Sequence, residues 1–364
     1  MKDSPTKTIC FFNSNQAWGG GEKWHFSTAK ELMRHGHNTI LVTNMRSELR
    51  RRAVDQGLNT YSFKISNLSF LNPFKLLILF LFFKTKKVDT VIMNLPADLK
   101  SAGIAAKLAG VKKIIYRRGM PHPLRPTKLN RFLFEKVLTQ VIVNSEEIGR
   151  SLAQGNDWFP KEKLVLIYNG VDTQATFNQA SKIYHKKNDE FVIGNAGRLT
   201  SQKGQKHLIE MGEILKSKNI NFHVLIAGEG ELKESLLQMI KAKNLEAHFT
   251  LLGHVSDMAS FMNSIDLFVF PSHFEGSANT LIETLYYQKP IVAFDVSSNP
   301  EIIQHRVNGL LARPFESEDL TQCVLELMNS KELRENCVIN GNKIVRAKFD
   351  NRKIFQLIEK TIIG

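Results

Sequence analysis

The residues best suited to chemistry in this chain are two glutamates eight positions apart, Glu275 and Glu283. The apolar run at 267–270 predicts a buried strand, and the pattern after it predicts a helix that Ser277 or Asn279 would cap. Glu275 would then lie in the connecting loop and Glu283 about one turn into the helix. We therefore expect both carboxylates to contact one ligand, Glu275 from the loop and Glu283 from the helix.

The first turn of that helix should also attract an anion. Backbone N–H groups at Asn279, Thr280 and Leu281 have no partner within a regular helix, and the positive end of the helix dipole favours negative charge there. The pattern predicts a phosphate bound between the two acids.

Two cations follow an earlier predicted strand, Phe191 to Asn195. Arg198 would leave the end of this strand, and Lys203 would stand near the start of a helix capped by Thr200 or Ser201. Both side chains could converge on the same anion, although solvated surface cations are the usual alternative. Because both are cations, we expect Arg198 and Lys203 to bind that anion if they converge on it.

Near the start of the chain, Gly19 and Gly20 belong to a triple glycine that precedes a helix predicted from about Glu22 to His35. Such a run permits close approach of a ligand to the backbone, or it is simply a flexible turn. The run is not GxGxxG, and the second strand ends as LVTN without an acidic residue. A dinucleotide-dependent dehydrogenase is therefore disfavoured.

In combination these motifs resemble the retaining glycosyltransferases of family 4. The resemblance also includes Pro300-Glu301 and a series of further motifs: Gly19-Gly20-Gly21-Glu22, Asn169-Gly170-Val171-Asp172, Gly197-Arg198-Leu199 with Lys203-Gly204, Gly228-Glu229-Gly230, and Gly253-His254-Val255. It implies an α/β GT-B fold, with two Rossmann-like doubly wound parallel-sheet domains facing a cleft.

The resemblance implies roles for the residues named above. Arg198 and Lys203 would bind the diphosphate, Glu275 the hydroxyls of the donor sugar, and Glu283 the ribose. Gly19 and Gly20 would approach the donor phosphate or the reacting sugar. The implied reaction moves a sugar from a UDP-, GDP- or ADP-sugar to an acceptor hydroxyl with retention, without a cofactor. Because the chain has no Asp-x-Asp, we expect catalysis without a metal.

One departure concerns the first domain, where family members often place a histidine after a central strand. Here Asn94 or Arg118 occupies the corresponding position, and His122 follows a few residues on. A single loop histidine is more often solvated than catalytic. The arginines at 117 and 118 are better suited to an acidic acceptor.

Short apolar runs alternate with helical patterns, which predicts parallel sheets covered by helices. We expect domains at 1–172 and 173–348, a polar linker at 172–190, and a last helix at about 349–363 in a terminal segment, 349–364, that crosses back to the first domain. Strands are predicted at 8–12, 39–43, 90–93, 113–116, 140–143 and 164–167, and then at 191–195, 223–227, 249–252, 267–270, 291–293 and 310–312.

Charge is divided unevenly between the two halves of this 364-residue chain. Residues 1–172 hold 27 Lys and Arg against 13 Asp and Glu, whereas residues 173–364 hold 22 of each, so the net charge of +14 lies in the first half. We expect an anionic membrane or a phosphorylated glycan or lipid acceptor as its partner. Nucleic acid is disfavoured because no helix-turn-helix, zinc finger or RNP-type motif is present.

Compartment and membrane topology follow from other features. The three cysteines lack zinc spacing and predict a reduced, cytoplasmic protein, and the first residues lack a signal-peptide core. The apolar run 76–83 is too short to span a bilayer. The segment 68–83 should be partly buried, with apolar surface left near the acceptor entrance, and lysines after it allow contact with the inner face of the cytoplasmic membrane.

Two other classes of function remain open. A nucleotide-sugar epimerase could share the architecture and the phosphate site, and would need no acceptor. A non-catalytic basic binding module would not require Glu275, Glu283, Arg198 and Lys203 together, and is the weaker alternative.

Overall fold

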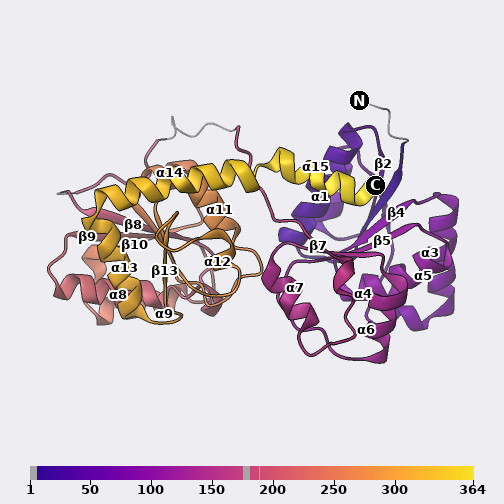
Figure 1. The fold of residues 1–364 in the computed structure, drawn as a ribbon, viewed down its shortest axis with the longest axis horizontal. Coiled ribbons are helices and arrows are strands. Elements are labelled where there is room, and N and C mark those ends of the chain that lie inside the picture. Colours follow the sequence, from indigo (N-terminus) through magenta and orange to yellow (C-terminus); the bar gives the residue numbers. More distant parts are fainter. Residues whose placement is uncertain (1–5, 175–180, 188) are drawn as a thin grey trace. The chain divides into compact units, whose positions relative to one another are not determined.

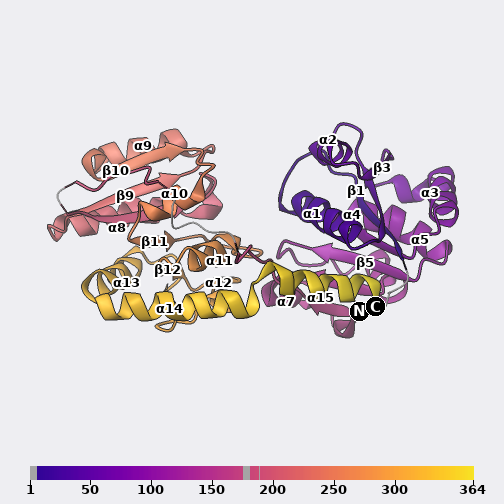
Figure 2. The same ribbon diagram turned by 90° about the horizontal axis from the view of Figure 1, so that it is seen from above.

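The computed structural model describes residues 6–174, 181–187 and 189–364 (Figure 1). The chain forms two compact units. Unit 1 contains the residues up to Tyr168 together with Phe355–Gly364, and unit 2 contains Asn169–Ile354. Each unit is one parallel sheet with helices on both faces (Figures 1 and 2).

The sheet of unit 1 has seven strands in the order β3-β2-β1-β4-β5-β6-β7, all paired in parallel. Because its strands run in one direction, all their carboxyl ends lie at the same edge. The strands are β1 Thr8–Asn13, β2 Asn38–Thr43, β3 Asn59–Ser62, β4 Thr90–Met93, β5 Lys113–Arg118, β6 Gln140–Val143 and β7 Leu164–Leu166.

Side chains that alternate along the strands build two apolar layers in unit 1. Cys10 and Phe12 of β1 join the buried cluster that covers one face, where α3 and α5 pack side by side (Figure 1). Phe11 points to the other face, where its ring contacts Trp24 of α1. The helices are α1 Gly20–Arg34, α2 Glu48–Asp55, η1 Ser69–Leu71, α3 Pro73–Thr85, α4 Pro96–Asp98, η2 Leu99–Gly103, α5 Ile104–Leu108, α6 Lys128–Phe132, η3 Leu133–Val137, α7 Glu146–Ala153 and η4 Lys161–Lys163.

Unit 2 has a six-stranded parallel sheet in the order β10-β9-β8-β11-β12-β13. Its strands are β8 Phe191–Ala196, β9 Phe222–Ala227, β10 Phe249–Gly253, β11 Leu267–Phe270, β12 Ile291–Phe294 and β13 Leu310–Ala312. They are apolar along nearly their whole length because helices cover both faces. The helices are η5 Ser201–Lys203, α8 Lys206–Ser217, α9 Lys233–Ala242, η6 Glu246–His248, α10 Met258–Asn263, α11 Asn279–Tyr286, α12 Asn299–Ile302, α13 Ser317–Asn329 and α14 Lys331–Lys348.

The last helix, α15 Asn351–Ile363, belongs to unit 1 from Phe355 onward. Its C-terminal carbonyls are tied to the sheet of that unit. Thr90 Oγ1 donates to the Ile362 carbonyl at 3.0 Å, and Lys113 Nζ donates to the Thr361 carbonyl at 2.9 Å. The chain thus returns to the sheet in which it began.

The predicted fold class is confirmed: both domains are Rossmann-like parallel sheets. All twelve predicted strands are present, and one further strand, β3, was not predicted. The compact units meet at residues 168 and 169, where the sequence suggested a boundary after 172. The predicted linker at 172–190 lies partly outside the described residues, which omit 175–180 and 188.

Candidate functional site

The carboxyl edge of the unit 2 sheet holds an ion pair between Lys203 and Glu275. Lys203 comes from η5 after β8, and Glu275 from the loop after β11. Lys203 Nζ lies 2.6 Å from Glu275 Oε1, and the two side chains are 16% and 8% exposed. The ammonium also lies 5.4 Å from the centre of the Phe270 ring. Lys203 and Glu275 therefore neutralise each other in a nearly buried position.

These loops pack closely against each other at two glycines, where a side chain would not fit. Gly204 has φ +63°, and a Cβ there would lie 2.1 Å from the Pro271 carbonyl oxygen. A Cβ on Gly228, after β9, would lie 1.9 Å from the Gly197 carbonyl oxygen. The turn that carries Lys203 is therefore packed directly against the backbone that leads to Glu275.

Arg198 differs from Lys203 in that no acidic side chain of the described residues forms an ion pair with it. Its backbone is fixed, since its carbonyl accepts a hydrogen bond from Gln205 Nε2 at 3.1 Å. Its side chain is exposed and has no hydrogen-bond or ion-pair partner within the described ranges. Its full positive charge is therefore available to an anion.

The start of α11 differs from the prediction in its cap. Ala278 stands at the cap position and makes no side-chain cap, so neither Ser277 nor Asn279 caps the helix as predicted. Instead, the Ser277 hydroxyl and the Asn169 amide both bond Asn279 Oδ1, at 3.1 and 2.8 Å. The polar side chains of Ser277 and Asn279 therefore bond each other and not the backbone of the first helical turn.

The prediction that these N–H groups are free is also wrong for two of the three residues. The Asn279 N–H donates to the Ser277 carbonyl at 2.8 Å, and the Leu281 N–H donates to the Ala278 carbonyl at 2.9 Å. The Thr280 N–H has no acceptor in the described part of the chain. It is the group of the three that remains available to a phosphate.

Glu283 lies on the fifth position of α11, about one turn into the helix as predicted, and is exposed. Glu275, in the loop before the helix, is buried. Pro300-Glu301, which belongs to the motifs of the resemblance, lies in the short helix α12.

A pair of histidines connects α8 to the loop that carries Glu275. This pair was not predicted from the sequence. His207 Nε2 of α8 lies 3.1 Å from Nε2 of His273, which stands two residues before Glu275. On its other side His207 Nδ1 bonds the Ser317 hydroxyl at 2.8 Å, and this hydroxyl donates to the Glu210 carboxylate. Burial lowers the pKa of His207, against the opposing effect of Glu210, and burial followed by the Lys206 charge lowers the pKa of His273.

Tautomers follow from this chain of bonds. Because Ser317 donates to a carboxylate, it accepts from His207 Nδ1–H, and His207 Nε2 must then accept a hydrogen bond from His273 Nε2–H. The hydrogen bond between the two rings therefore requires that His207 is neutral. The sequence offered a weak signal, a histidine inside the PSHFEG motif.

In unit 1 the glycine run starts α1 two residues earlier than predicted. Gly19 is the cap residue, and a Cβ on Gly20 would meet no atom within 4 Å, so the space over Gly20 is open. Gly21 is the constrained one, since its Cβ would lie 2.1 Å from Asn94 Nδ2. Asn94, at the end of β4, therefore lies directly against the start of α1.

Two buried acids lie at the same edge of unit 1. Glu22 Oε1 accepts from the side-chain amides of Asn13 and Asn15 at 3.1 and 3.0 Å. Asp98 Oδ2 accepts from the Ser14 N–H at 3.0 Å, while Asp98 Oδ1 is buried without a partner. Burial, with the Glu22 charge adding to it, raises the pKa of Asp98 to about 7.

Sequence reasoning missed Asp98. The available signal was its position after Pro96, just beyond the carboxyl end of a predicted strand.

The two arginines after β5 are not equivalent. Arg117 is buried with its guanidinium 4.6 Å from the centre of the Trp24 ring, and burial lowers its pKa to about 10. Arg118 bonds the Tyr116 hydroxyl and the His122 carbonyl, both at 3.1 Å. The suggestion that both arginines face an acidic acceptor is therefore wrong for Arg117.

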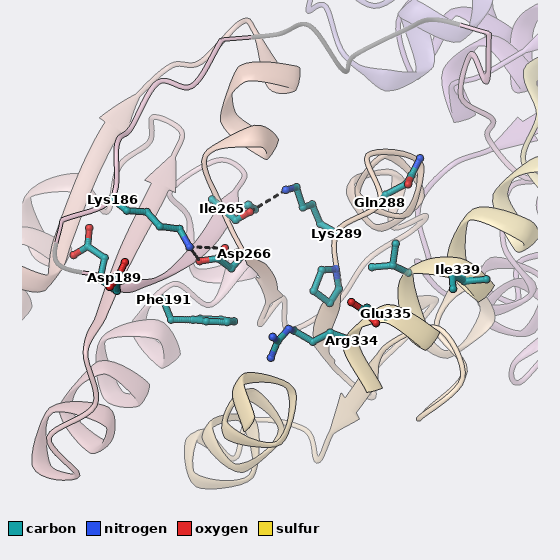
Figure 3. A pocket seen from close by; sticks show the side chains of 13 residues that line it. Lys186, Asp189, Phe191, Ile265, Asp266, Gln288, Lys289, Arg334, Glu335 and Ile339 are labelled. Atoms are coloured by element: carbon teal, nitrogen blue, oxygen red, sulfur yellow. Dashed lines mark hydrogen bonds and ion pairs between the residues drawn. The ribbon is translucent and has the colours of Figure 1, made fainter. Parts of the chain in front are cut away.

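A separate pocket of about 540 Å³ lies in unit 2, where β8, β11 and β12 begin (Figure 3). Lys186 is paired there with Asp266, and Lys289 donates to the Ile265 carbonyl at 3.0 Å. None of the predicted site residues lines this pocket, and its edge of the sheet is opposite to the one that carries Lys203. We do not assign the donor to it.

No cluster of three or more His, Cys, Asp or Glu side chains suited to a metal ion occurs in residues 6–174, 181–187 and 189–364. Independence of a metal stays a prediction.

Comparison with known proteins agrees with this architecture. The family model described as Glycosyltransferase Family 4 matches residues 18–175, and the model described as Glycosyl transferases group 1 matches residues 176–344. The two models adjoin and leave only the ends of the chain unmatched. The chain belongs to the family 4 glycosyltransferases with the GT-B fold.

Two relatives with curated names share part of the sequence. The capsular polysaccharide biosynthesis glycosyltransferase CapM of Staphylococcus aureus is 30% identical over 63% of this chain and 63% of its own length. A 4-alpha-N-acetylgalactosaminyltransferase of Campylobacter jejuni, named for a diphospho-undecaprenol substrate, is 30% identical over 65% of this chain and 64% of its own length. The chain thus matches just under two thirds of the length of each.

A solved structure, Anabaena HepE in complex with UDP, superposes with a TM-score of 0.82 at 21% identity. The superposition covers 97% of this chain and 99% of HepE. At this identity the likeness shows the fold.

Proposed function

We propose that the protein transfers a hexose or related sugar from a nucleoside diphosphate to an acceptor hydroxyl, with retention at the anomeric carbon. The observation that carries this proposal is the grouping of Arg198, Lys203 and Glu275 at the carboxyl edge of the unit 2 sheet. Ligands of open α/β sheets bind at this edge.

The two cations would stabilise the leaving diphosphate in different ways. Lys203 already balances Glu275 at 2.6 Å, so the pair adds hydrogen-bond donors but little net charge. Among the described residues Arg198 has no such partner, and it would supply the net positive charge for the two phosphates. The Thr280 N–H, at the positive end of α11, adds a fixed donor to the same group.

Glu275 and Glu283 would position the donor at its two ends. The buried Glu275 would accept hydrogen bonds from hydroxyls of the sugar. Its ion pair with Lys203 would hold the carboxylate in place. The exposed Glu283 accepts from the ribose. Neither acts as a nucleophile in this scheme.

The reaction would proceed on one face of the sugar. The bond from the anomeric carbon to the phosphate oxygen breaks, the acceptor oxygen bonds the same carbon from the same side, and the acceptor proton passes to the departing phosphate oxygen. Negative charge grows on that phosphate, so fixed donors aimed at it lower the barrier. In other enzymes, loss of one such donor lowers the rate by about 10² to 10³.

Unit 1 would bind the acceptor. Its excess of Lys and Arg suits a phosphorylated or lipid-linked glycan, the kind of substrate that the name of the Campylobacter relative contains. We further propose that the protein works at the cytoplasmic side of an anionic membrane as a peripheral protein. Its products would belong to a cell-surface polysaccharide or lipopolysaccharide.

Catalysis would need neither a cofactor nor a metal, because Arg198 and Lys203 take the place of a divalent ion on the diphosphate. EDTA should then leave turnover unchanged. Loss of turnover with EDTA and recovery with Mn²⁺ would contradict this part of the proposal.

Incubation with a panel of UDP-, GDP- and ADP-sugars tests the function. We expect slow hydrolysis of one donor to free sugar and nucleoside diphosphate in the absence of acceptor, detected by mass spectrometry. Epimerised sugar nucleotide as the product would indicate an epimerase, an alternative that the two matched families do not favour. No turnover of any donor, with or without membrane extract as acceptor, would contradict the proposal.

A further inference from the structure

Unit 1 displays an unusual group of exposed apolar side chains on η1, on α3 and on the residue just before η1. Six large apolar residues of this segment are between 49% and 75% exposed. We call them the α3 apolar face: Leu68, Leu71, Phe74, Leu77, Ile78 and Leu81. Single exposed leucines are common in soluble proteins, whereas a contiguous group of this size marks a contact surface.

The helix is apolar on two sides, and only one side is used by the fold. Leu79, Phe82 and Phe83 are buried in the core of unit 1. Phe74, Leu77, Ile78 and Leu81 stand at positions i, i+3, i+4 and i+7 of one helical stripe and lie on the opposite side. The fold does not need this second stripe, so it is available for another contact.

Charge around the face has one sign. Residues 56–88 contain five lysines and no Asp or Glu. Of these lysines, Lys64, Lys84 and Lys87 are exposed, and their ammonium groups have no acidic partner within the described residues. An apolar stripe with lysines around it complements a surface that offers both hydrocarbon and negative charge.

The α3 apolar face begins at the edge of the sheet where the acceptor would bind. The chain leaves β3 at its carboxyl end, passes through η1, and returns along α3 to the amino end of β4. Lys100, which follows the carboxyl end of β4, has its ammonium 5.9 Å from the centre of the Phe70 ring in η1. Leu68, Leu71 and Phe74 therefore lie at the same edge as Asn94.

Two other modes of contact fit less well. In the described part of the chain no helix combines the length and apolarity needed to cross a bilayer, and the 13 residues of α3 extend only about 20 Å. A second copy of the chain on a two-fold axis would place the same lysines against each other. The combination of an apolar stripe and a basic margin is instead typical of helices that lie in the lipid interface.

We propose that the α3 apolar face docks unit 1 onto an anionic lipid bilayer, with α3 lying in the interfacial layer and its lysines on the lipid headgroups. This orientation would bring the carboxyl edge of the unit 1 sheet to the membrane surface. The inference rests on the proposed function only in that a lipid-linked acceptor gives the docking its use.

Vesicle sedimentation tests the docking without any sugar substrate. Phosphatidylcholine vesicles with about a third phosphatidylglycerol should bind the protein, and binding should weaken as salt shortens the Debye length below ~10 Å. A variant with Leu77→Ser, Ile78→Ser and Leu81→Ser should bind at least tenfold more weakly. These positions are exposed, so thermal melting should be unchanged.

Matched controls come from unit 2. Leu237→Ser with Ile339→Ser removes two exposed apolar side chains that lie elsewhere, and should leave vesicle binding unchanged.

The charge contribution is tested in unit 1 itself. Lys84→Gln with Lys87→Gln should weaken vesicle binding at least fivefold and make that binding less dependent on salt.

The depth of insertion provides a second measurement. Tryptophan at Leu77 (Leu77→Trp) should be quenched by brominated acyl chains in the vesicles, beyond the background of the three native tryptophans. Tryptophan at Ile339 (Ile339→Trp) should not be quenched beyond that background.

Three results would overturn the proposal. The first is equal binding to neutral and anionic vesicles, and the second is unchanged binding by the triple serine variant. The third is a dimer in light scattering that the triple variant dissociates, which would assign the face to a second copy. Because the vesicle assay contains no nucleotide sugar, its failure leaves transfer to a soluble acceptor untouched, and failure of transfer leaves the docking result untouched.

Discussion

Lys203 and Glu275 make a prediction that separates stability from catalysis. With 8% of its side chain exposed, Glu275 has little water to replace Lys203 as a partner. Lys203→Met should therefore leave a buried, unpaired carboxylate, at a cost of about 3 kcal/mol, the lower end of the range for a broken buried pair. For a domain of this size we expect the midpoint of thermal unfolding to fall by about 6 to 12 °C.

Glu275→Leu should cost less, because the 16% exposed ammonium of Lys203 can move toward water. The double variant replaces the ion pair by two apolar side chains of similar size and should recover most of the lost stability. The coupling free energy between the two positions should therefore be about 2 kcal/mol.

Activity should not follow stability in this series. All three variants lose donors or acceptors for the nucleotide sugar, so each should turn over donor at least about a hundredfold more slowly, including the stable double variant. Thermal melts and donor hydrolysis on the same four proteins provide the test. Additive effects on the melting midpoint, or a double variant with normal turnover, would refute the reasoning.

Three further predictions concern single sites. Arg198→Ala should lower turnover at least about a hundredfold without changing the melt, whereas Arg346→Ala, which removes an exposed arginine of α14, should do neither. The pKa of Asp98 is raised from 3.8 to about 7, so the folded protein holds a proton that the unfolded chain releases in this interval. That contribution to stability is complete below pH 3.8 and is lost as pH rises through 7, so Asp98→Asn should reduce the difference between melts at pH 5 and pH 8. His207 and His273 have lowered pKa values, so their contribution is present above the unfolded value of 6.5 and is lost as pH falls below it. His273→Gln still donates a hydrogen bond but does not titrate, and should make unfolding of unit 2 less sensitive to acid; an unchanged acid dependence would contradict the contribution of His273 to it.

The strands could be predicted from sequence because both faces of each sheet are covered. A strand buried on both sides needs a continuous apolar run, and such runs occur at all twelve predicted positions. The strand β3 has the sequence NTYS and lies at the edge of its sheet, only partly buried. Its place is set by pairing with β2, which leaves no apolar run to recognise.

The residues of the proposed donor site could be placed at strand ends from the sequence because their spacing is linked to those ends, but their contacts could not be predicted. That Lys203 pairs with Glu275 depends on packing between Gly204 and Pro271, which are far apart in sequence. The cap of α11 failed as a prediction because hydrogen bonds within the preceding turn took the groups that a cap would use. Asp98 was missed because burial of a carboxyl group is a property of the whole unit.

The central claim, that the carboxyl edge of unit 2 binds the diphosphate of a nucleotide, is tested most directly by calorimetric titration. UDP, GDP and ADP are compared with their monophosphates on the wild type and on Arg198→Ala. One diphosphate should bind the wild type at least tenfold more tightly than its monophosphate, and Arg198→Ala should abolish that preference. No binding of any diphosphate, or an equal preference in Arg198→Ala, would contradict the account.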